Sequence, residues 1–122
     1  AKVKGDKMVL ITDCTRAGGM PDGEYELGGQ PIFLKGIECR LADGTIAGSV
    51  LKLNDAVKNV INHTNLPANE VFNMASLNPA KAIHKDDRIG SLEAGKDADI
   101  IIADENINII RTIKKGKTVY EA

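Results

Sequence analysis

The sequence of 122 residues has no tryptophan, only two cysteines and two histidines, and no long hydrophobic run. No stretch approaches the roughly 18 to 20 consecutive apolar residues that a membrane-spanning helix requires. The basic, glycine-containing start of the chain, residues 1–7, also lacks the apolar centre of a secretory signal peptide. Together these absences predict a cytoplasmic protein that makes no use of a membrane.

The charge balance argues against nucleic acid as a partner. The chain carries 16 basic and 17 acidic residues scattered along its length, and its formal net charge is -1. It has no basic stripe of the kind that neutralises phosphate backbones. With 43% hydrophobic residues, the composition predicts a globular domain with a modest core.

Cys14 and Cys39 are too few and too far apart to predict a disulfide framework or a thiolate zinc site. Cys14 follows a carboxylate, Asp13, which raises the question of a nucleophilic thiol. No histidine is near it in the sequence, and a neighbouring carboxylate opposes formation of the thiolate. We therefore interpret both cysteines as reduced and incidental.

The stretch Met8–Asp13 organises the chain. It is an unbroken apolar run that ends in Asp13 and is followed by the flexible segment 14–19. A short apolar run stopped by turn residues is typical of a strand buried on both faces, as in a parallel sheet. Asp13 would then lie at the carboxyl end of that strand, where α/β folds place their functional groups. The alternative is that Asp13 only starts a turn.

A parallel strand needs neighbours that are joined to it by crossover connections, and the sequence contains only one strand of this type. The chain also begins at Ala1 without an initiator methionine. We expect it to be a piece of a larger protein.

The segment 24–47 changes to short polar and apolar stretches separated by glycine turns. It predicts antiparallel strands at Tyr25–Leu27, Ile32–Leu34 and Ile37–Leu41. Such an arm is a candidate lid or substrate wall. An excursion on the surface without a role is the alternative.

Helices are predicted after this arm. Apolar residues recur at helical spacing from Leu53 to Ile61, and Pro67 and Pro79 each mark the first position of a further helix. His63 and His84 fall at helix ends, where the helix dipole favours a cation. We therefore interpret both as helix-end residues rather than as metal ligands.

The tail predicts three short strands, at Ile100–Ala103, Ile107–Ile113 and Lys117–Tyr120, with a turn at 115–116. Three strands of this length are marginal alone, so we expect them to join strands supplied elsewhere.

Three motifs are candidates for catalysis. Gly90–Lys96 matches the glycine and lysine spacing of a phosphate-binding P-loop, but Asp97 replaces the required hydroxyl and the loop precedes a strand rather than a helix. Asp13 followed by Thr15 resembles a phosphoaspartyl site without its second acid. A metal hydrolase would use Asp13 to accept a proton from an activated water, but two separated histidines do not supply its ligands.

Taken together, four blocks resemble the carboxyl-terminal part of the amidohydrolase superfamily: Leu10–Asp13, Ile46–Ser49, Ala75–Ala80 and Ile89–Asp99. The last two contain the Asn-Pro-Ala and Gly-x-Leu-x-x-Gly-Lys-x-Ala-Asp patterns that identify the superfamily. The order of the Thr-Asp strand, the hairpin arm and the Ala-Gly-Ser segment points, within it, to the N-acetylglucosamine-6-phosphate deacetylases.

The resemblance implies the α/β fold class: the C-terminal part of a metal-dependent-hydrolase (β/α)8 TIM barrel, followed by the C-terminal strands of a small β-sandwich. Residues 1–95 would hold the last barrel strand, the hairpin arm and the closing helices. Residues 96–122 would hold the sandwich strands. A complete barrel takes about 250 residues, so most of it lies outside this chain.

The resemblance also implies the site. Asp13 matches the catalytic aspartate that takes a proton from a metal-bound water and protonates the departing amine. Ile46, Ala47 and Gly48 match a segment that contacts the sugar. The family's divalent metal, zinc or similar, is held by ligands that no position of this chain matches.

The implied function is hydrolysis of the N-acetyl group of N-acetylglucosamine 6-phosphate by the parent protein, in amino-sugar catabolism, with the chain alone inactive. The implied partner is a small amino-sugar phosphate, and exposed strand edges predict a homo-oligomer. The alternatives are an amidohydrolase with another amide substrate and a non-enzymatic assembly module.

Overall fold

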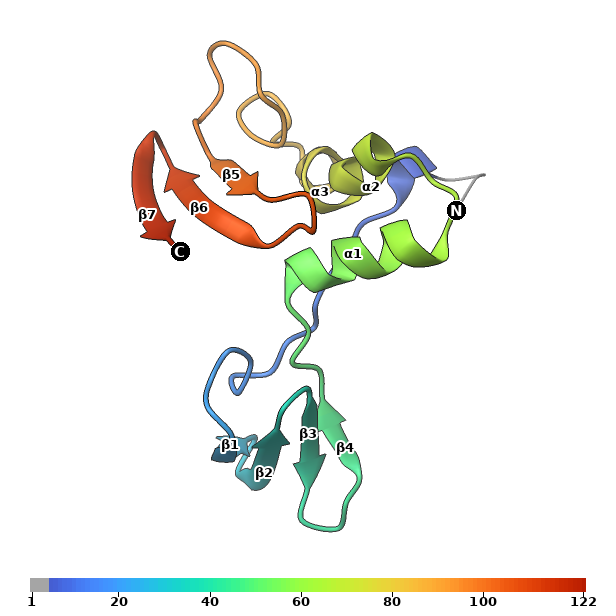
Figure 1. The fold of residues 1–122 in the computed structure, drawn as a ribbon, viewed down its shortest axis with the longest axis vertical. Coiled ribbons are helices and arrows are strands. Elements are labelled where there is room, and N and C mark those ends of the chain that lie inside the picture. Colours follow the sequence, from blue (N-terminus) through green and yellow to red (C-terminus); the bar gives the residue numbers. More distant parts are fainter. Residues whose placement is uncertain (1–4) are drawn as a thin grey trace. The chain divides into compact units, whose positions relative to one another are not determined.

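A computed structural model describes residues 5–122 of the chain (Figure 1). The chain divides into two compact units. One is Ile11–Ala56, and the other combines residues 5–10 with Val57–Ala122. The predicted boundary at residue 95 refers to a complete barrel and a composite sandwich, and it stays a prediction.

The unit Ile11–Ala56 holds a four-stranded antiparallel sheet in the order β1-β2-β3-β4. Its strands are β1 (Gly23–Leu27), β2 (Gln30–Lys35), β3 (Glu38–Leu41) and β4 (Ile46–Gly48). The three predicted strands are confirmed, and no end differs from its predicted position by more than two residues. The fourth was not predicted as a strand, because Ile46–Gly48 is too short to show alternation and carries a glycine.

Tight turns set the register of this sheet. Gly28 and Gly29 both have positive φ between the paired residues Leu27 and Gln30, as a two-residue hairpin of the I′ type requires. The β2–β3 turn places Gly36 at φ +59°, and Asp22 Oδ1 accepts its N–H at 2.8 Å. The glycines that separate the strands in the sequence predict these turns.

The core of the same unit lies on one face of β2 and β3. Alternate residues of β2, Ile32 and Leu34, are buried while their neighbours are exposed. Cys39 on β3 and Ala17 from the loop complete the buried cluster. Burial of Cys39 as a small apolar side chain agrees with its interpretation as incidental to the chemistry.

The structure corrects the prediction at Met8–Asp13, where no strand is assigned. A 3-10 turn, η1 (Gly5–Lys7), precedes this stretch. Its hydrogen bonds to the rest of the chain include that of Leu10 N to Met74 O at 2.8 Å. Parallel pairing is limited, among the described residues, to an isolated bridge between Cys14 and Ser49. A strand requires a neighbour along its length, and residues 5–122 supply one only at this end.

The helices are α1 (Leu53–His63), α2 (Ala68–Ala75) and α3 (Leu77–Ala82). The prediction of all three is confirmed, with corrected ends. Pro67 is the N-cap of α2 rather than its first residue, and α3 begins two residues before Pro79. His84 lies beyond the end of α3 with φ +55°. None of these helices is both long and apolar enough to cross a membrane.

Asn78, from the Asn-Pro-Ala pattern, ties α3 to the start of the chain. Its side chain is buried, and Nδ2 donates to the carbonyl oxygens of Gly5 at 2.9 Å and Met8 at 2.8 Å. One amide therefore satisfies two backbone acceptors that lie about seventy residues away. The asparagine of the Asn-Pro-Ala pattern therefore stabilises the packing of α3 against residues 5–8.

Replacing Asn78 with alanine is expected to lower the free energy of unfolding by about 1 to 3 kcal/mol, because two partly buried carbonyl oxygens lose their donor. Urea unfolding of the whole protein measures the change. Asn73→Ala is the matched control, since the Asn73 amide on neighbouring α2 is half-buried and has no hydrogen bond among the described residues. Equal losses for the two variants would contradict the role of Asn78.

The second sheet is three-stranded and antiparallel in the order β5-β6-β7. Its strands are β5 (Ile100–Ala103), β6 (Ile109–Lys114) and β7 (Lys117–Glu121), drawn in orange and red in Figure 1. The predicted turn at Lys115 and Gly116 is confirmed, and both residues have positive φ. Asp99 Oδ1 accepts the N–H of Lys115 at 2.8 Å, which anchors the turn to the residue before β5.

The predicted strand start at Ile107 is wrong, because a loop occupies 104–108. Asp104 accepts the backbone N–H groups of Asn106 and Asn108 and the side-chain amide of Asn108. These bonds, led by those from Asn108, hold the pKa of Asp104 below its usual range. Ile107 has φ +60°, which extended backbone does not allow.

The observed architecture is therefore α/β with two small antiparallel sheets and three helices among residues 5–122. The barrel and the sandwich require strands beyond this chain, and both stay predictions.

Candidate active site

Asp13 occupies an unusual backbone position. Its φ is +47°, in the left-handed region, and its side chain is exposed. No hydrogen bond or ion pair engages its carboxylate among residues 5–122. Aspartate adopts this left-handed conformation more readily than most residues do. Bulky side chains would pay a larger steric cost there. A carboxylate in this position, with no partner among residues 5–122, can accept a proton and pass it on.

The chain beyond Asp13 is fixed to the end of β4. Cys14 and Ser49 form a parallel bridge, and Thr15 N donates to Ser49 O at 2.8 Å. The predicted catalytic residue and the predicted sugar-contacting segment Ile46–Gly48 therefore come from adjoining stretches of one compact unit.

The approach between these stretches is close at Gly48. A Cβ atom placed on Gly48 would lie 2.6 Å from Cγ2 of Thr15, a distance that real side chains do not adopt. The hydroxyl Oγ1 of Thr15 is buried and has no partner among residues 5–122. Glycine at 48 is needed for the contact with Thr15, a reason that the sequence did not reveal.

The three predicted sugar-contacting residues differ in exposure. The β3–β4 register shifts so that Cys39 pairs with Gly48 and Arg40 with Ile46, leaving Ala47 as the extra residue of a bulge. Ala47 packs against the buried core cluster, whereas Ile46 is 70% exposed. Of the two side chains, only that of Ile46 presents a large surface to a ligand.

The thiol of Cys14 is not activated by a base in this unit. Its Sγ donates to Thr15 O at 3.4 Å, and both histidines of the sequence lie outside Ile11–Ala56. A Cβ on Gly18 would lie 2.0 Å from this sulfur, so Gly18 makes room for it. The side chain of Cys14 is exposed and packs beside Gly18 of its own loop.

The described residues offer no ligand set for a metal. No group of three or more histidine, cysteine, aspartate or glutamate side chains gathers anywhere in residues 5–122. His63 Nδ1 donates to Asn59 O, 2.8 Å away within α1. This agrees with its interpretation as a helix-end residue. The divalent metal implied by the resemblance therefore does not fit the residues of this chain by themselves.

The P-loop-like segment is a structural loop. Lys96 is largely buried, and its Nζ donates to Ser91 Oγ at 2.6 Å and lies 3.5 Å from a carboxylate oxygen of Glu93. The loop leads into β5 and not into a helix. Lys96 is thus engaged within its own loop, which supports interpretation of the match as chance.

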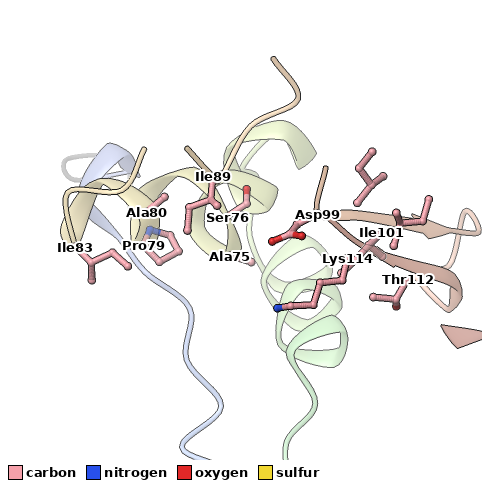
Figure 2. A pocket seen from close by; sticks show the side chains of 13 residues that line it. Ala75, Ser76, Pro79, Ala80, Ile83, Ile89, Asp99, Ile101, Thr112 and Lys114 are labelled. Atoms are coloured by element: carbon pink, nitrogen blue, oxygen red, sulfur yellow. The ribbon is translucent and has the colours of Figure 1, made fainter. Parts of the chain in front are cut away.

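A second candidate is an apolar cleft of about 500 Å³ in the other unit (Figure 2). Side chains of α3, including Pro79, and of Ile83 just after it face the cleft from one side, and those of β5 and β6, including Ile101, face it from the other. Its charged residues are Asp99, whose carboxylate accepts the Lys115 N–H, and Lys114. The rest of the lining is mostly aliphatic, which suits an apolar ligand better than a sugar phosphate.

Comparison with known proteins identifies the family of this chain. The model of the amidohydrolase family matches residues 2–119, nearly the whole chain. The chain belongs to the amidohydrolase family. The name of this family indicates hydrolases and favours neither the phosphoaspartyl nor the P-loop hypothesis.

Two relatives that this chain resembles are both named as deacetylases of N-acetylated amino-sugar 6-phosphates. The N-acetylglucosamine-6-phosphate deacetylase of Bacillus subtilis (strain 168) is 41% identical over 114 residues, covering 93% of this chain and 29% of that protein. The N-acetylgalactosamine-6-phosphate deacetylase of Escherichia coli O157:H7 is 39% identical over 104 residues, covering 85% of this chain and 28% of that protein.

A solved structure extends the likeness to the fold. The deacetylase of Mycobacterium smegmatis in complex with N-acetyl-D-glucosamine-6-phosphate matches with a TM-score of 0.82 and 30% identity, over 96% of this chain and 32% of that one. This chain thus spans about a third of the length of each of these three relatives.

Proposed function

We propose that this chain is the carboxyl-terminal part of a protein that hydrolyses N-acetylglucosamine 6-phosphate to glucosamine 6-phosphate and acetate. The observation that carries the proposal is an exposed, unpaired carboxylate at a positive-φ bend, joined to Ile46–Gly48 within one unit. The names of the B. subtilis and M. smegmatis relatives support the substrate.

In this proposal Asp13 moves a proton twice. Its carboxylate accepts a proton from the water that attacks the acetyl carbonyl carbon. The C–N bond then breaks, and the same proton goes to the departing amine, so that acetate and a free amino sugar result. Because no hydrogen bond engages the Asp13 carboxylate among residues 5–122, both of its oxygens are available for this exchange.

The substrate contact is assigned to Ile46, Ala47 and Gly48. Ile46 presents an exposed apolar side chain, which suits the face of a sugar ring or the acetyl methyl group. The bulge at Ala47 interrupts the ladder and frees backbone groups for a ligand. The C-4 epimer, N-acetylgalactosamine 6-phosphate, is the second candidate substrate, because the E. coli relative carries that name.

The proposal also covers features that this chain does not show by itself. A divalent metal, zinc or similar, would be held by residues of the missing barrel strands, and the C-terminal strands β5–β7 would complete a sandwich. A homo-oligomer, a cytoplasmic location and the absence of nucleic-acid and membrane partners complete the proposal.

The test is an assay of acetate release by the whole protein, with N-acetylglucosamine 6-phosphate, its C-4 epimer, unphosphorylated N-acetylglucosamine and a cyclic amide as substrates. The expected order of kcat/KM places N-acetylglucosamine 6-phosphate first. The 122-residue chain alone is the control, and we expect no turnover from it, since residues 5–122 hold no metal ligand set. Turnover of the cyclic amide alone, or deacetylation by the isolated chain at the rate of the whole protein, would contradict the proposal.

A further inference from the structure

Thr15 lies two residues after Asp13 and makes two kinds of contact with the β4 segment. Its N–H donates to Ser49 O at 2.8 Å. Its methyl group, Cγ2, lies so close to Gly48 that a Cβ there would be 2.6 Å away. The first contact fixes the backbone along the strand direction, and the second fixes the separation between the two stretches.

The bend at Asp13 makes this separation important. A left-handed residue has few neighbouring conformations to relax into, so a shift imposed at Thr15 is passed through Cys14 to Asp13. The loop is also tight at Gly18, where a Cβ would lie 2.0 Å from Cys14 Sγ. Residues 13–18 therefore have little freedom to absorb a displacement.

We propose that Thr15 is a positioning residue, whose methyl group packs on Gly48 and thereby sets the location of the Asp13 carboxylate relative to Ile46–Gly48. The inference rests on the proposed function, because it specifies how the proton-transferring carboxylate is aligned with the substrate. The β-branched side chain suits this task, since its χ1 is restricted and its methyl group is held near the backbone.

The proposal makes the effect of a methyl group at 48 depend on the methyl group at 15. Gly48→Ala forces Thr15 away, displacing Asp13, and a misplacement of about 1 Å costs about 100-fold in rate. Thr15→Ser removes only Cγ2 and keeps the hydroxyl and the backbone hydrogen bond. The double variant has space for the new Cβ, so Asp13 returns to its position.

The experiment compares wild type, Gly48→Ala, Thr15→Ser and the double variant in the whole protein, measuring kcat and KM for N-acetylglucosamine 6-phosphate. We expect kcat to fall about 10- to 100-fold in Gly48→Ala and to recover most of that loss in the double variant. Gly23→Ala is the matched control, because a Cβ there meets its nearest atoms at an ordinary 3.9 Å.

Rescue separates positioning from direct contact with the sugar. If Gly48→Ala acts only by obstructing substrate, KM rises and Thr15→Ser restores nothing, which overturns the inference. Unchanged kcat in Gly48→Ala overturns it too. Melting temperatures of the same variants test the contact without any activity: additive shifts overturn it, whereas recovery in the double variant supports it. A wild-type protein that releases no acetate would contradict the proposed function and leave this melting test in force.

Discussion

Replacing Asp13 with asparagine in the whole protein is expected to lower kcat for N-acetylglucosamine 6-phosphate by about 10² to 10⁴-fold, the contribution typical of one positioned acid or base. The amide of asparagine neither accepts the proton of the attacking water nor delivers it to the amine. Steady-state acetate release measures the loss. The non-enzymatic alternative, an assembly module, predicts no change in turnover.

Asparagine is the informative replacement because of the backbone at this position. With φ at +47°, Asp13 lies in a region where asparagine is also readily accommodated, so the fold is retained. Alanine would add a conformational cost of about 1 to 2 kcal/mol and confuse stability with catalysis. Glu24→Gln is the control, since Glu24 is another exposed carboxylate of the same unit, outside the candidate site. Equal turnover in the Asp13 and Glu24 variants would remove Asp13 from the mechanism.

Replacing Gly90 with alanine is expected to lower the free energy of unfolding by about 2 to 5 kcal/mol, the sum of a left-handed backbone cost and overpacking. Gly90 has φ +93°, and a Cβ there would lie 2.7 Å from Cβ of Ala80 and 3.1 Å from Cα of Leu77. Both neighbours belong to α3, so neither moves aside easily. Urea unfolding of the whole protein measures the effect.

Gly95 provides the matched control for this clash. It lies in the same loop with φ +90°, but nothing is within 4 Å of the position its Cβ would take. Gly95→Ala should therefore show only the backbone cost, about 1 to 2 kcal/mol. The difference between the two variants isolates the packing of Gly90 on α3. Equal losses would mean that this packing adds nothing and that conformation alone requires glycine at both positions.

These two glycines also separate what local sequence determines from what tertiary contact decides. Both belong to the stretch that matched a P-loop by spacing. The sequence excluded phosphate binding through Asp97 and through the strand that follows, and the hydrogen bond from Lys96 to Ser91 agrees. The sequence did not distinguish Gly90 from Gly95, because the distinction lies in the contacts of Gly90 with Leu77 and Ala80 of α3, which are ten or more residues away.

The candidate site also combines residues predicted from the sequence with contacts that only the structure shows. The resemblance carried Asp13 and Ile46–Gly48, and those assignments stay predictions. The bend at Asp13, the bridge from Cys14 to Ser49 and the contact of Thr15 with Gly48 came from the structure. A threonine and a glycine some thirty residues apart carry no local pattern that pairs them.

The sequence by itself determined the hairpin turns, the helices and the superfamily, because glycine pairs, helical spacing and motif blocks act over a few residues. Tertiary structure decided that Met8–Asp13 forms no strand here, since a strand depends on partners and not on its own composition. It also decided that Asn78 donates hydrogen bonds to the carbonyl oxygens of Gly5 and Met8. The pairing of Cys14 with Ser49, next to β4, was decided in the same way. Each of these features depends on which distant segments meet, and only the folded chain brings them together.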